Sequence, residues 1–145
     1  MSTYMSHGPG RKLSWDELRT FDVVLTTYGT LGAEFRRKEI WEQKQRESGQ
    51  KDYDKAPMRK LFPLLGEKSI FYRVILDEAQ CIKNKSTGAS RAAKELKAKT
   101  RFCLTGTPMM NNVGELYSLI HFLRIKPYNE WSRFQEVGQR SSQHR

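Results

Sequence analysis

The sequence predicts an α/β domain, a parallel sheet with flanking helices. Three short segments, residues 22–27, 71–76 and 101–105, are rich in β-branched or aromatic side chains and too short for helices. The last two are apolar runs, which is typical of strands covered by helices on both faces. Helical patterns lie between and after these segments, and this alternation favours parallel strands joined by right-handed crossovers.

Each further element has its own local signal. Residues 3–8 are expected to be the remnant of a strand. Residues 14–17 (Ser-Trp-Asp-Glu) have the form of a capping box, which opens a short helix. Residues 87–98 carry Ala, Lys, Glu and Leu at a density typical of a helix. Another helix is expected over residues 112–123, where an asparagine caps the start and the leucines share one face.

Residues 36–60 differ from the rest of the chain because acidic and basic side chains crowd together there. We expect a helix that continues into a mobile, solvated loop. A nucleic-acid contact surface is the alternative, but the mixture of both charge signs favours the loop. The predicted domain covers residues 1–135 with this charged insertion, and a polar tail follows over residues 136–145. We expect the tail to be disordered from Gly138 onward.

The bulk composition narrows the class of partner only partly. The 145 residues carry a formal net charge of +10, with a mean hydropathy of −0.74. The charge favours an anionic partner, first of all nucleic acid, but one basic loop could equally account for the excess. Cys81 and Cys103 form no Cys-x-x-Cys pair, and we expect both to be reduced. No apolar run approaches the roughly 20 residues of a membrane span, and no signal segment is visible, so no membrane partner is expected.

Small polar or acidic residues follow all three predicted strands. The first strand ends in Thr26-Thr27-Tyr28, the second in Asp77-Glu78 and the third in Thr105-Gly106-Thr107-Pro108. If the strands are parallel neighbours, these ends converge on one edge of the sheet. Folds of this kind bind their ligands at that edge.

Asp77 and Glu78 suit a site that hydrolyses a nucleotide. Asp77 can hold Mg²⁺ through the water shell of the ion, because Mg²⁺ prefers oxygen ligands and keeps several waters. Glu78 can orient or deprotonate the water that attacks the γ-phosphate. The alternative is an acidic pair that caps the following helix, where negative charge suits the helix dipole. The pair alone does not decide between the two.

The order of the motifs resembles the ATP-binding lobe of superfamily-two helicases. Asp77-Glu78-Ala79-Gln80 is similar to their motif II, residues 104–108 (Leu-Thr-Gly-Thr-Pro) to motif III, and residues 25–28 (Leu-Thr-Thr-Tyr) to motif Ib. The flanking residues resemble the Swi/Snf family of DNA translocases over most of residues 4–134, outside the charged insertion. These flanking matches are Ile82-Lys83-Asn84, Ser90-Arg91-Ala92, Asn111-Asn112, Glu115-Leu116-Tyr117-Ser118-Leu119 and Phe122-Leu123.

A finer resemblance points to one branch of that family. Gln80, where His is commoner, and residues 123–128 resemble the branch that contains post-replication-repair translocases and fungal SUMO-targeted DNA translocases. Met109-Met110 is closer to the fungal SUMO-targeted members. Met110 stands where most relatives have glutamine, a departure that affects any polar contact made at that position.

The resemblance implies a fold, cofactors and partners. The fold would be a partial RecA-like parallel sheet with flanking helices, in which the N-terminal half of the lobe is missing. The intact protein would use ATP and Mg²⁺, act on double-stranded DNA or chromatin, and be nuclear. It would meet SUMO or ubiquitin machinery through regions outside this chain.

The resemblance also assigns roles to individual residues. Asp77 and Glu78 would be the Mg²⁺ and catalytic-water carboxylates, and Gln80 would couple the nucleotide site to motif III. The motif III residues implied in this coupling are Thr105, Gly106 and Thr107. The residues implied to lie near the DNA backbone are Thr27, Lys83 and Asn84. Phosphate contacts of this kind position a protein on DNA without reading its sequence; without the resemblance, Lys83 would be an ordinary exposed lysine.

Several parts of such a motor are absent from the sequence. It has no Gly-x-x-x-x-Gly-Lys-Ser/Thr run to cradle phosphates and no second lobe with arginine fingers. Two cysteines and three histidines cannot supply the eight ligands of a RING module. We therefore expect a marginally stable fragment of a DNA-dependent ATPase that exposes apolar sheet edges and is not catalytic alone. The alternative is a non-catalytic DNA-binding or interaction remnant that has lost ATP binding.

Overall fold

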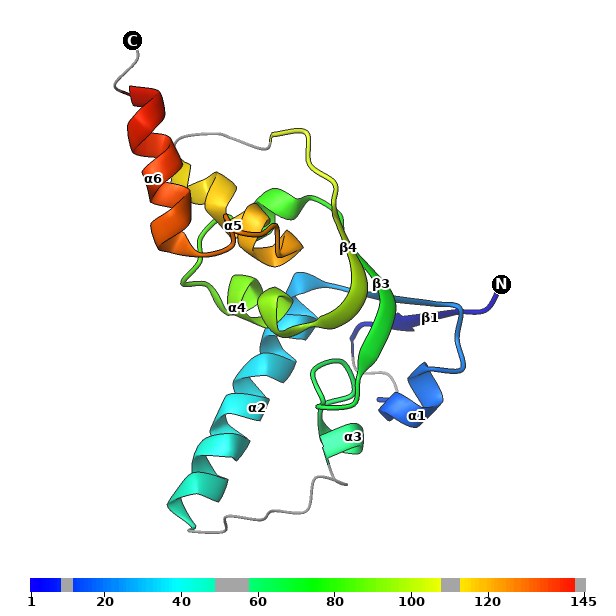
Figure 1. Ribbon diagram of the computed structural model, residues 1–145. Helices are drawn as coiled ribbons and strands as arrows, with labels where there is room; N and C mark the ends of the chain where they lie inside the picture. The colour runs from blue at the N-terminus through cyan, green and yellow to red at the C-terminus, as the bar shows by residue number, and fades with distance from the viewer. Residues whose placement is uncertain (9–11, 49–57, 108–112, 143–145) are drawn as a thin grey trace.

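The strands form two separate parallel pairs in the computed structural model (Figure 1). The structure describes residues 1–8, 12–48, 58–107 and 113–142. Its strands are β1 (Thr3–Ser6), β2 (Val23–Thr26), β3 (Ile70–Leu76) and β4 (Lys97–Cys103). β1 pairs with β2, and β3 pairs with β4. The predicted α/β class and the parallel pairing are confirmed, but β2 and β3 are not hydrogen-bonded neighbours, so the three predicted strands do not share one sheet.

Helices lie on both sides of the β3–β4 pair. In chain order they are α1 (Trp15–Leu18), α2 (Tyr28–Glu47), α3 (Met58–Leu61), the 3₁₀ helix η1 (Ala79–Ile82), α4 (Gly88–Glu95), α5 (Val113–Leu123) and α6 (Trp131–Ser142). Figure 1 shows α4 and α5 on one side of β3 and β4, and α1 on the other. In the described part of the chain, no helix combines the length and the apolar character that a membrane crossing needs.

The start of α1 confirms the predicted capping box. The Ser14 hydroxyl accepts a hydrogen bond from the Glu17 N–H at 3.4 Å, and the Glu17 carboxylate accepts one from the Ser14 N–H at 2.8 Å. Trp15 then packs edge-on against Phe71 of β3, with ring centroids 5.1 Å apart. The cap therefore holds α1 where its aromatic residue covers the second sheet.

The predicted helix over residues 87–98 is too long at its C-terminal end. Helix α4 ends at Glu95, and Lys97 and Ala98 are the first residues of β4. They pair with Ile70 and Phe71 of β3. The helix propensity of Lys and Ala is a weak preference, and strand pairing overrides it here. β4 accordingly begins four residues before the predicted strand.

The charged segment begins as part of a long helix, as predicted. Residues 36–47 continue α2, and residues 49–57, where the predicted loop falls, lie outside the described residues. Two charges on this helix are paired with α4: Lys38 Nζ lies 2.5 Å from Glu95 Oε2, and Arg91 forms an ion pair with Glu39. Part of the charge in this segment therefore serves the packing of α2 against α4.

The expectation of a disordered tail from Gly138 is wrong for residues 138–142, which complete helix α6. Two aromatic residues in the first turns of α6 anchor this helix to α5. The rings of Trp131 and Phe134 lie 4.8 and 5.3 Å from the Tyr117 ring. Once a helix is anchored in this way, each added residue extends it at low cost, which accounts for its polar continuation.

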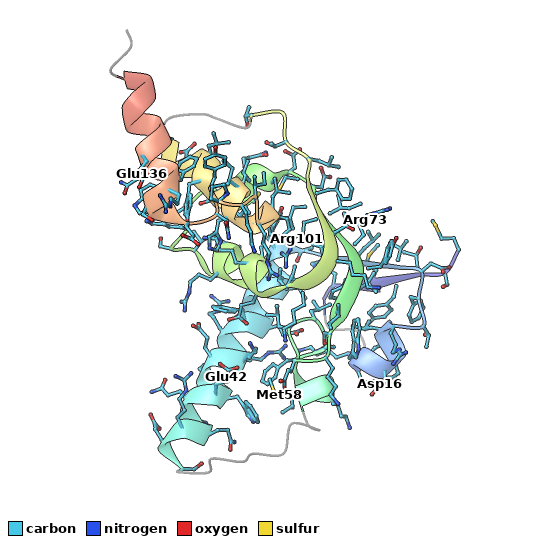
Figure 2. All side chains as sticks on the ribbon, viewed as in Figure 1. Asp16, Glu42, Met58, Arg73, Arg101 and Glu136 are labelled. Atoms are coloured by element: carbon cyan, nitrogen blue, oxygen red, sulfur yellow. The ribbon has the colours of Figure 1, made fainter. Side chains whose placement is uncertain are left out.

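The core lies between β3, β4 and the helices that follow them. Ala79, Ile82, Ala93 and Phe122 are at most 1% exposed, and Leu76 packs with them. Outside this core the strands are poorly covered: the exposed apolar side chains on or just after them include Leu25, Tyr72, Ile75, Phe102 and Leu104. The expected exposure of apolar sheet surface is therefore present. Figure 2 shows Arg73 and Arg101 on these strands, and Arg101 packs over the Phe122 ring.

Candidate functional site

Asp77 and Glu78 lie directly after β3, where the chain turns into η1. Asp77 Oδ1 accepts a hydrogen bond from the Glu78 N–H at 2.9 Å. Glu78 has a left-handed backbone, with φ 47° and ψ 49°, which is uncommon for a residue other than glycine. Such conformations cluster at functional sites, where the surrounding structure holds them. Glu78 is the residue before η1, but its carboxylate makes no capping hydrogen bond, so the capping alternative is not what the structure shows.

A chain of hydrogen bonds joins this acidic turn to the end of β4. The Gln80 amide donates to Glu78 Oε2, and the Thr105 hydroxyl donates to Gln80 Oε1 at 2.7 Å. The Thr107 N–H donates in turn to Thr105 Oγ1 at 3.2 Å, across Gly106. The structure therefore brings the six residues predicted from motif II and motif III together in two adjacent turns, with Asp77 linked through the Glu78 N–H. The two turns are also joined directly, since the Ala79 N–H donates to the Leu104 carbonyl at 2.9 Å.

The end of β2 reaches the same place although it belongs to the other sheet. Thr27 caps α2 by accepting from the Thr30 N–H at 3.1 Å. The next residue, Tyr28, donates its hydroxyl to the main-chain carbonyl of Asp77 at 2.8 Å. Burial raises the pKa of Tyr28 well above its usual value, with further contributions from the nearby cysteines and acids. Tyr28 belongs to the segment that resembles motif Ib, but nothing local in the sequence predicts this contact.

Lys83 and Asn84, the other two residues predicted to lie near DNA, contact neighbouring parts of the protein. The Lys83 carbonyl accepts from the Ser118 hydroxyl at 2.8 Å, and Lys83 Nζ lies 3.8 Å from Glu115 Oε1. Asn84 Oδ1 accepts from both the N–H and the hydroxyl of Ser86, which closes a tight turn before α4. Lys83 therefore contacts α5, and Asn84 stabilises the turn before α4. Ser118 and Glu115 belong to a segment that resembles the family, and in the structure both contact Lys83.

The two carboxylates of Asp77 and Glu78 suit a partly hydrated Mg²⁺ ion, but they are too few for a metal site made of protein ligands alone. The described residues contain no group of three or more His, Cys, Asp or Glu side chains placed to hold a metal ion. Both carboxylates are exposed hard oxygen donors. Mg²⁺ is usually held by one or two carboxylates together with waters and substrate phosphates. The site could therefore contribute to binding Mg²⁺ that also has phosphate ligands.

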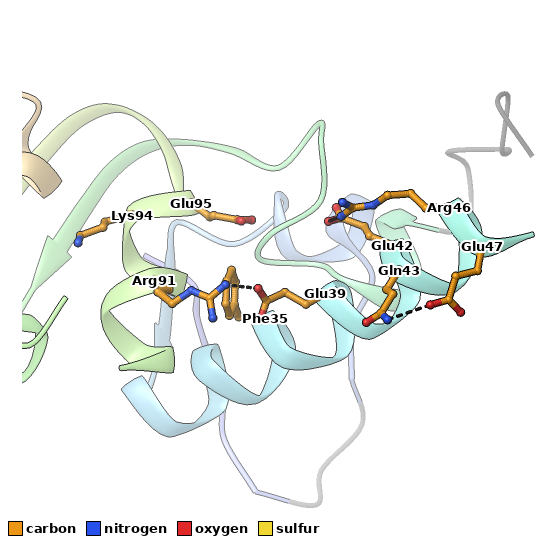
Figure 3. A pocket seen from close by; sticks show the side chains of 9 residues that line it. All are labelled: Phe35, Glu39, Glu42, Gln43, Arg46, Glu47, Arg91, Lys94 and Glu95. Atoms are coloured by element: carbon orange, nitrogen blue, oxygen red, sulfur yellow. Dashed lines mark hydrogen bonds and ion pairs between the residues drawn. The ribbon is translucent and has the colours of Figure 1, made fainter. Parts of the chain in front are cut away.

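A cavity of about 520 Å³ opens between the two sheets and reaches this site. Its lining includes Val24 and Leu25 of β2, Val74 and Ile75 of β3, and Asp77. A second cavity, of about 620 Å³, lies between α2 and α4 (Figure 3). None of the predicted site residues lines the second cavity, and two of its charged side chains, Glu39 and Arg91, form an ion pair with each other. We therefore do not assign the site there.

The cysteines agree with the expected reduced state. Both thiols are free, Cys81 is exposed, and Cys103 is partly covered on β4. Burial raises the pKa of the Cys103 thiol to about 11, so this thiol stays protonated at neutral pH.

The fold and the site define a class: parallel α/β domains that carry an acidic turn after one strand and a threonine relay after the next. The chain belongs to the SNF2-related domain family, whose sequence profile matches residues 2–145. An uncharacterized ATP-dependent helicase of Schizosaccharomyces pombe is 44% identical over 134 residues, which are 92% of this chain and 12% of that protein. The ATP-dependent helicase ULS1 of Saccharomyces cerevisiae is 38% identical over 143 residues, covering 90% of this chain and 9% of its own length.

A solved structure agrees with this family. The SWI2/SNF2 ATPase core of Sulfolobus solfataricus in complex with double-stranded DNA matches with a TM-score of 0.53 and 29% identity, covering 92% of this chain and 22% of that one. The chain thus spans about a tenth of the length of the curated relatives that it matches. The DNA repair protein RAD5A of Arabidopsis thaliana, 35% identical over 140 residues, covers 97% of this chain and 12% of its own length. The predicted family and its repair branch are confirmed.

Proposed function

We propose that this chain is the middle of the first ATP-binding lobe of a DNA-dependent ATPase that moves along double-stranded DNA in chromatin remodelling or repair. The observation that carries the proposal is the hydrogen-bonded path from Glu78 through Gln80 to Thr105, at the ends of two paired parallel strands. Nucleotide chemistry in parallel α/β folds takes place at this edge. Relatives that are named ATP-dependent helicases support the same activity for the intact protein.

In this proposal Asp77, Glu78 and Gln80 each have a different role in ATP hydrolysis. Asp77 would hold Mg²⁺ through water, and the ion, when bound, would neutralise charge on the phosphates. Glu78 would orient the attacking water and accept its proton. Gln80 hydrogen-bonds to both Glu78 and Thr105, so a change in the position of the Glu78 carboxylate would alter the position of Thr105 and the turn that follows. The left-handed backbone of Glu78 directs its carboxylate away from capping η1 and leaves it to contact Gln80.

The DNA side of the proposal rests on charge and hydroxyl groups near the same edge. Thr27 and Asn84 offer short polar side chains, and Lys83 offers a cation that Glu115 holds at 3.8 Å. DNA phosphate would compete with Glu115 for this lysine. The intact protein would be nuclear, and contacts with SUMO or ubiquitin machinery would lie in regions outside this chain. On its own the chain would bind duplex DNA without hydrolysing ATP.

Duplex affinity measured against salt tests the DNA contact. Each phosphate contact contributes roughly −0.9 to the slope of log affinity against log salt, so wild-type affinity should fall steeply between about 50 and 200 mM salt. Lys83→Gln should make this slope shallower by about one such contact. Lys68→Gln, which removes an equal charge from an exposed turn after α3, is the matched control and should keep the slope. A flat salt response in the wild type would remove the DNA-contact proposal.

ATP turnover with and without duplex DNA tests the claim that the chain is inactive alone. We expect no DNA-stimulated turnover. Turnover that is stimulated by DNA and abolished by Glu78→Gln would contradict that claim, while assigning the catalytic role to Glu78 directly.

A further inference from the structure

The peptide group between Asp77 and Glu78 is held at both of its polar ends. Its carbonyl oxygen accepts the Tyr28 hydroxyl at 2.8 Å, and its N–H donates to Asp77 Oδ1 at 2.9 Å. The orientation of this peptide determines the ψ of Asp77 and the φ of Glu78. Glu78 adopts its uncommon left-handed backbone directly after this peptide. The Tyr28 hydroxyl therefore helps to fix the direction in which the Glu78 carboxylate leaves the chain.

Tyr28 reaches this peptide from the other sheet. It is the first residue of α2, and the residue before it, Thr27, follows β2 directly and caps the helix. β2 and β3 share no ladder hydrogen bonds, so Tyr28 provides a direct polar link between their carboxyl ends. A shift of the Thr27 turn would move the N-terminus of α2 and, with it, the Tyr28 hydroxyl that contacts Asp77.

The link is a single hydrogen bond from a side chain to the main chain. The phenol is half-buried, and its hydroxyl is the donor in this contact. Its acceptor is the main-chain carbonyl of Asp77, at 2.8 Å. The link therefore joins the N-terminus of α2 directly to the acidic turn.

We propose that Tyr28 is a positioning residue that couples DNA contact at Thr27 to the orientation of the Asp77–Glu78 peptide. This coupling rests on the proposed function, because it requires duplex DNA to bind near Thr27. In the intact ATPase, DNA binding would then set the direction of the Glu78 carboxylate before hydrolysis. Tyr28 touches neither substrate nor water in this role and acts only through the peptide.

Amide hydrogen exchange over residues 77–82, measured with and without saturating duplex DNA, tests the coupling without ATP hydrolysis. In the wild type, DNA should slow exchange in this segment. Tyr28→Phe should reduce that slowing by about fivefold, the factor that an ordinary hydrogen bond is worth. Because coupling is reciprocal, any loss of DNA affinity should not exceed about the same factor, so exchange is compared with each protein saturated by duplex. Tyr128→Phe, which removes a hydroxyl from an exposed ring beyond α5, is the matched control and should respond like the wild type.

The remaining outcomes separate this proposal from the one that it rests on. Tyr28→Phe that binds DNA and shows the full slowing overturns the coupling and leaves DNA binding intact, as does a wild type that binds DNA with no slowing. A wild type that binds no duplex overturns both. If Tyr28→Phe unfolds, 4-fluorophenylalanine at position 28 fills the volume of the hydroxyl without donating, and the same reduced slowing is expected.

Discussion

Glu34 offers the sharpest test of the packing, because a carboxylate on the buried face of α2 is unusual. It is 4% exposed, and its Oε1 accepts hydrogen bonds from the Leu64 and Leu65 N–H groups at 2.8 and 2.9 Å. Glu34→Ala leaves both N–H groups buried without an acceptor. Each such group costs about 1–3 kcal/mol, so we expect the two together to lower the free energy of unfolding by about 2–6 kcal/mol.

Urea unfolding followed by circular dichroism measures this loss, and Glu34→Gln is the matched control. The glutamine retains the carbonyl oxygen that accepts both bonds, so it should lose much less stability than the alanine variant. If Glu34→Ala lost less than about 1 kcal/mol, or if Glu34→Gln were destabilised as much, the two hydrogen bonds would not hold this turn.

The pH dependence of the free energy of unfolding, compared between the wild type and Glu34→Gln, tests the charge on Glu34. Burial raises the pKa of Glu34 above its usual 4.5, and the hydrogen bonds from Leu65 and Leu64 oppose that shift without cancelling it. The folded state therefore keeps its proton to higher pH than the unfolded state. The contribution to stability is fully present below about pH 4.5 and falls as pH rises through the folded pKa. Glu34→Gln should lack this component, and an identical pH profile in both proteins would contradict the assignment.

Three further changes have defined expected results. Gly66→Ala places a Cβ 2.8 Å from a backbone carbonyl oxygen, so it should lower the free energy of unfolding in urea by about 1–3 kcal/mol; an unchanged midpoint would refute the close approach. Thr105→Val removes the donor to Gln80 and should cost about 0.5–1.5 kcal/mol in the same assay, whereas a more stable variant would show that the relay is not formed. Iodoacetamide at pH 8 should label Cys81 before Cys103, because the Cys103 pKa is raised to about 11, and mass spectrometry that found the reverse order would contradict its burial.

The acidic turn and its relay could be predicted from the sequence because their determinants are local. Asp77 and Thr105 each follow a short apolar run, and the ends of parallel neighbours must meet. The site also needed the family resemblance, since an acidic pair alone equally suits a helix cap. The role of Tyr28 was not predictable, because it depends on a contact with Asp77, 49 positions along the chain.

Parts of the fold escaped prediction because their determinants are distant. Glu34 lies beside a highly charged run, and nothing local shows that a turn 30 residues later supplies its donors. Lys97 and Ala98 favour helix by propensity, and only their pairing with β3 makes them strand. The polar end of α6 depends likewise on Trp131, which packs on a tyrosine of the preceding helix.

The left-handed backbone at Glu78 places two demands on one position. Glycine or asparagine would adopt this conformation with less strain, at a gain of the order of 1 kcal/mol, but neither has the carboxylate that reaches Gln80. A selection for thermal stability alone should therefore recover Gly or Asn at this position, and a selection for ATP-driven movement in the intact protein should retain Glu. Comparing the two selections would separate what the fold prefers from what the chemistry requires.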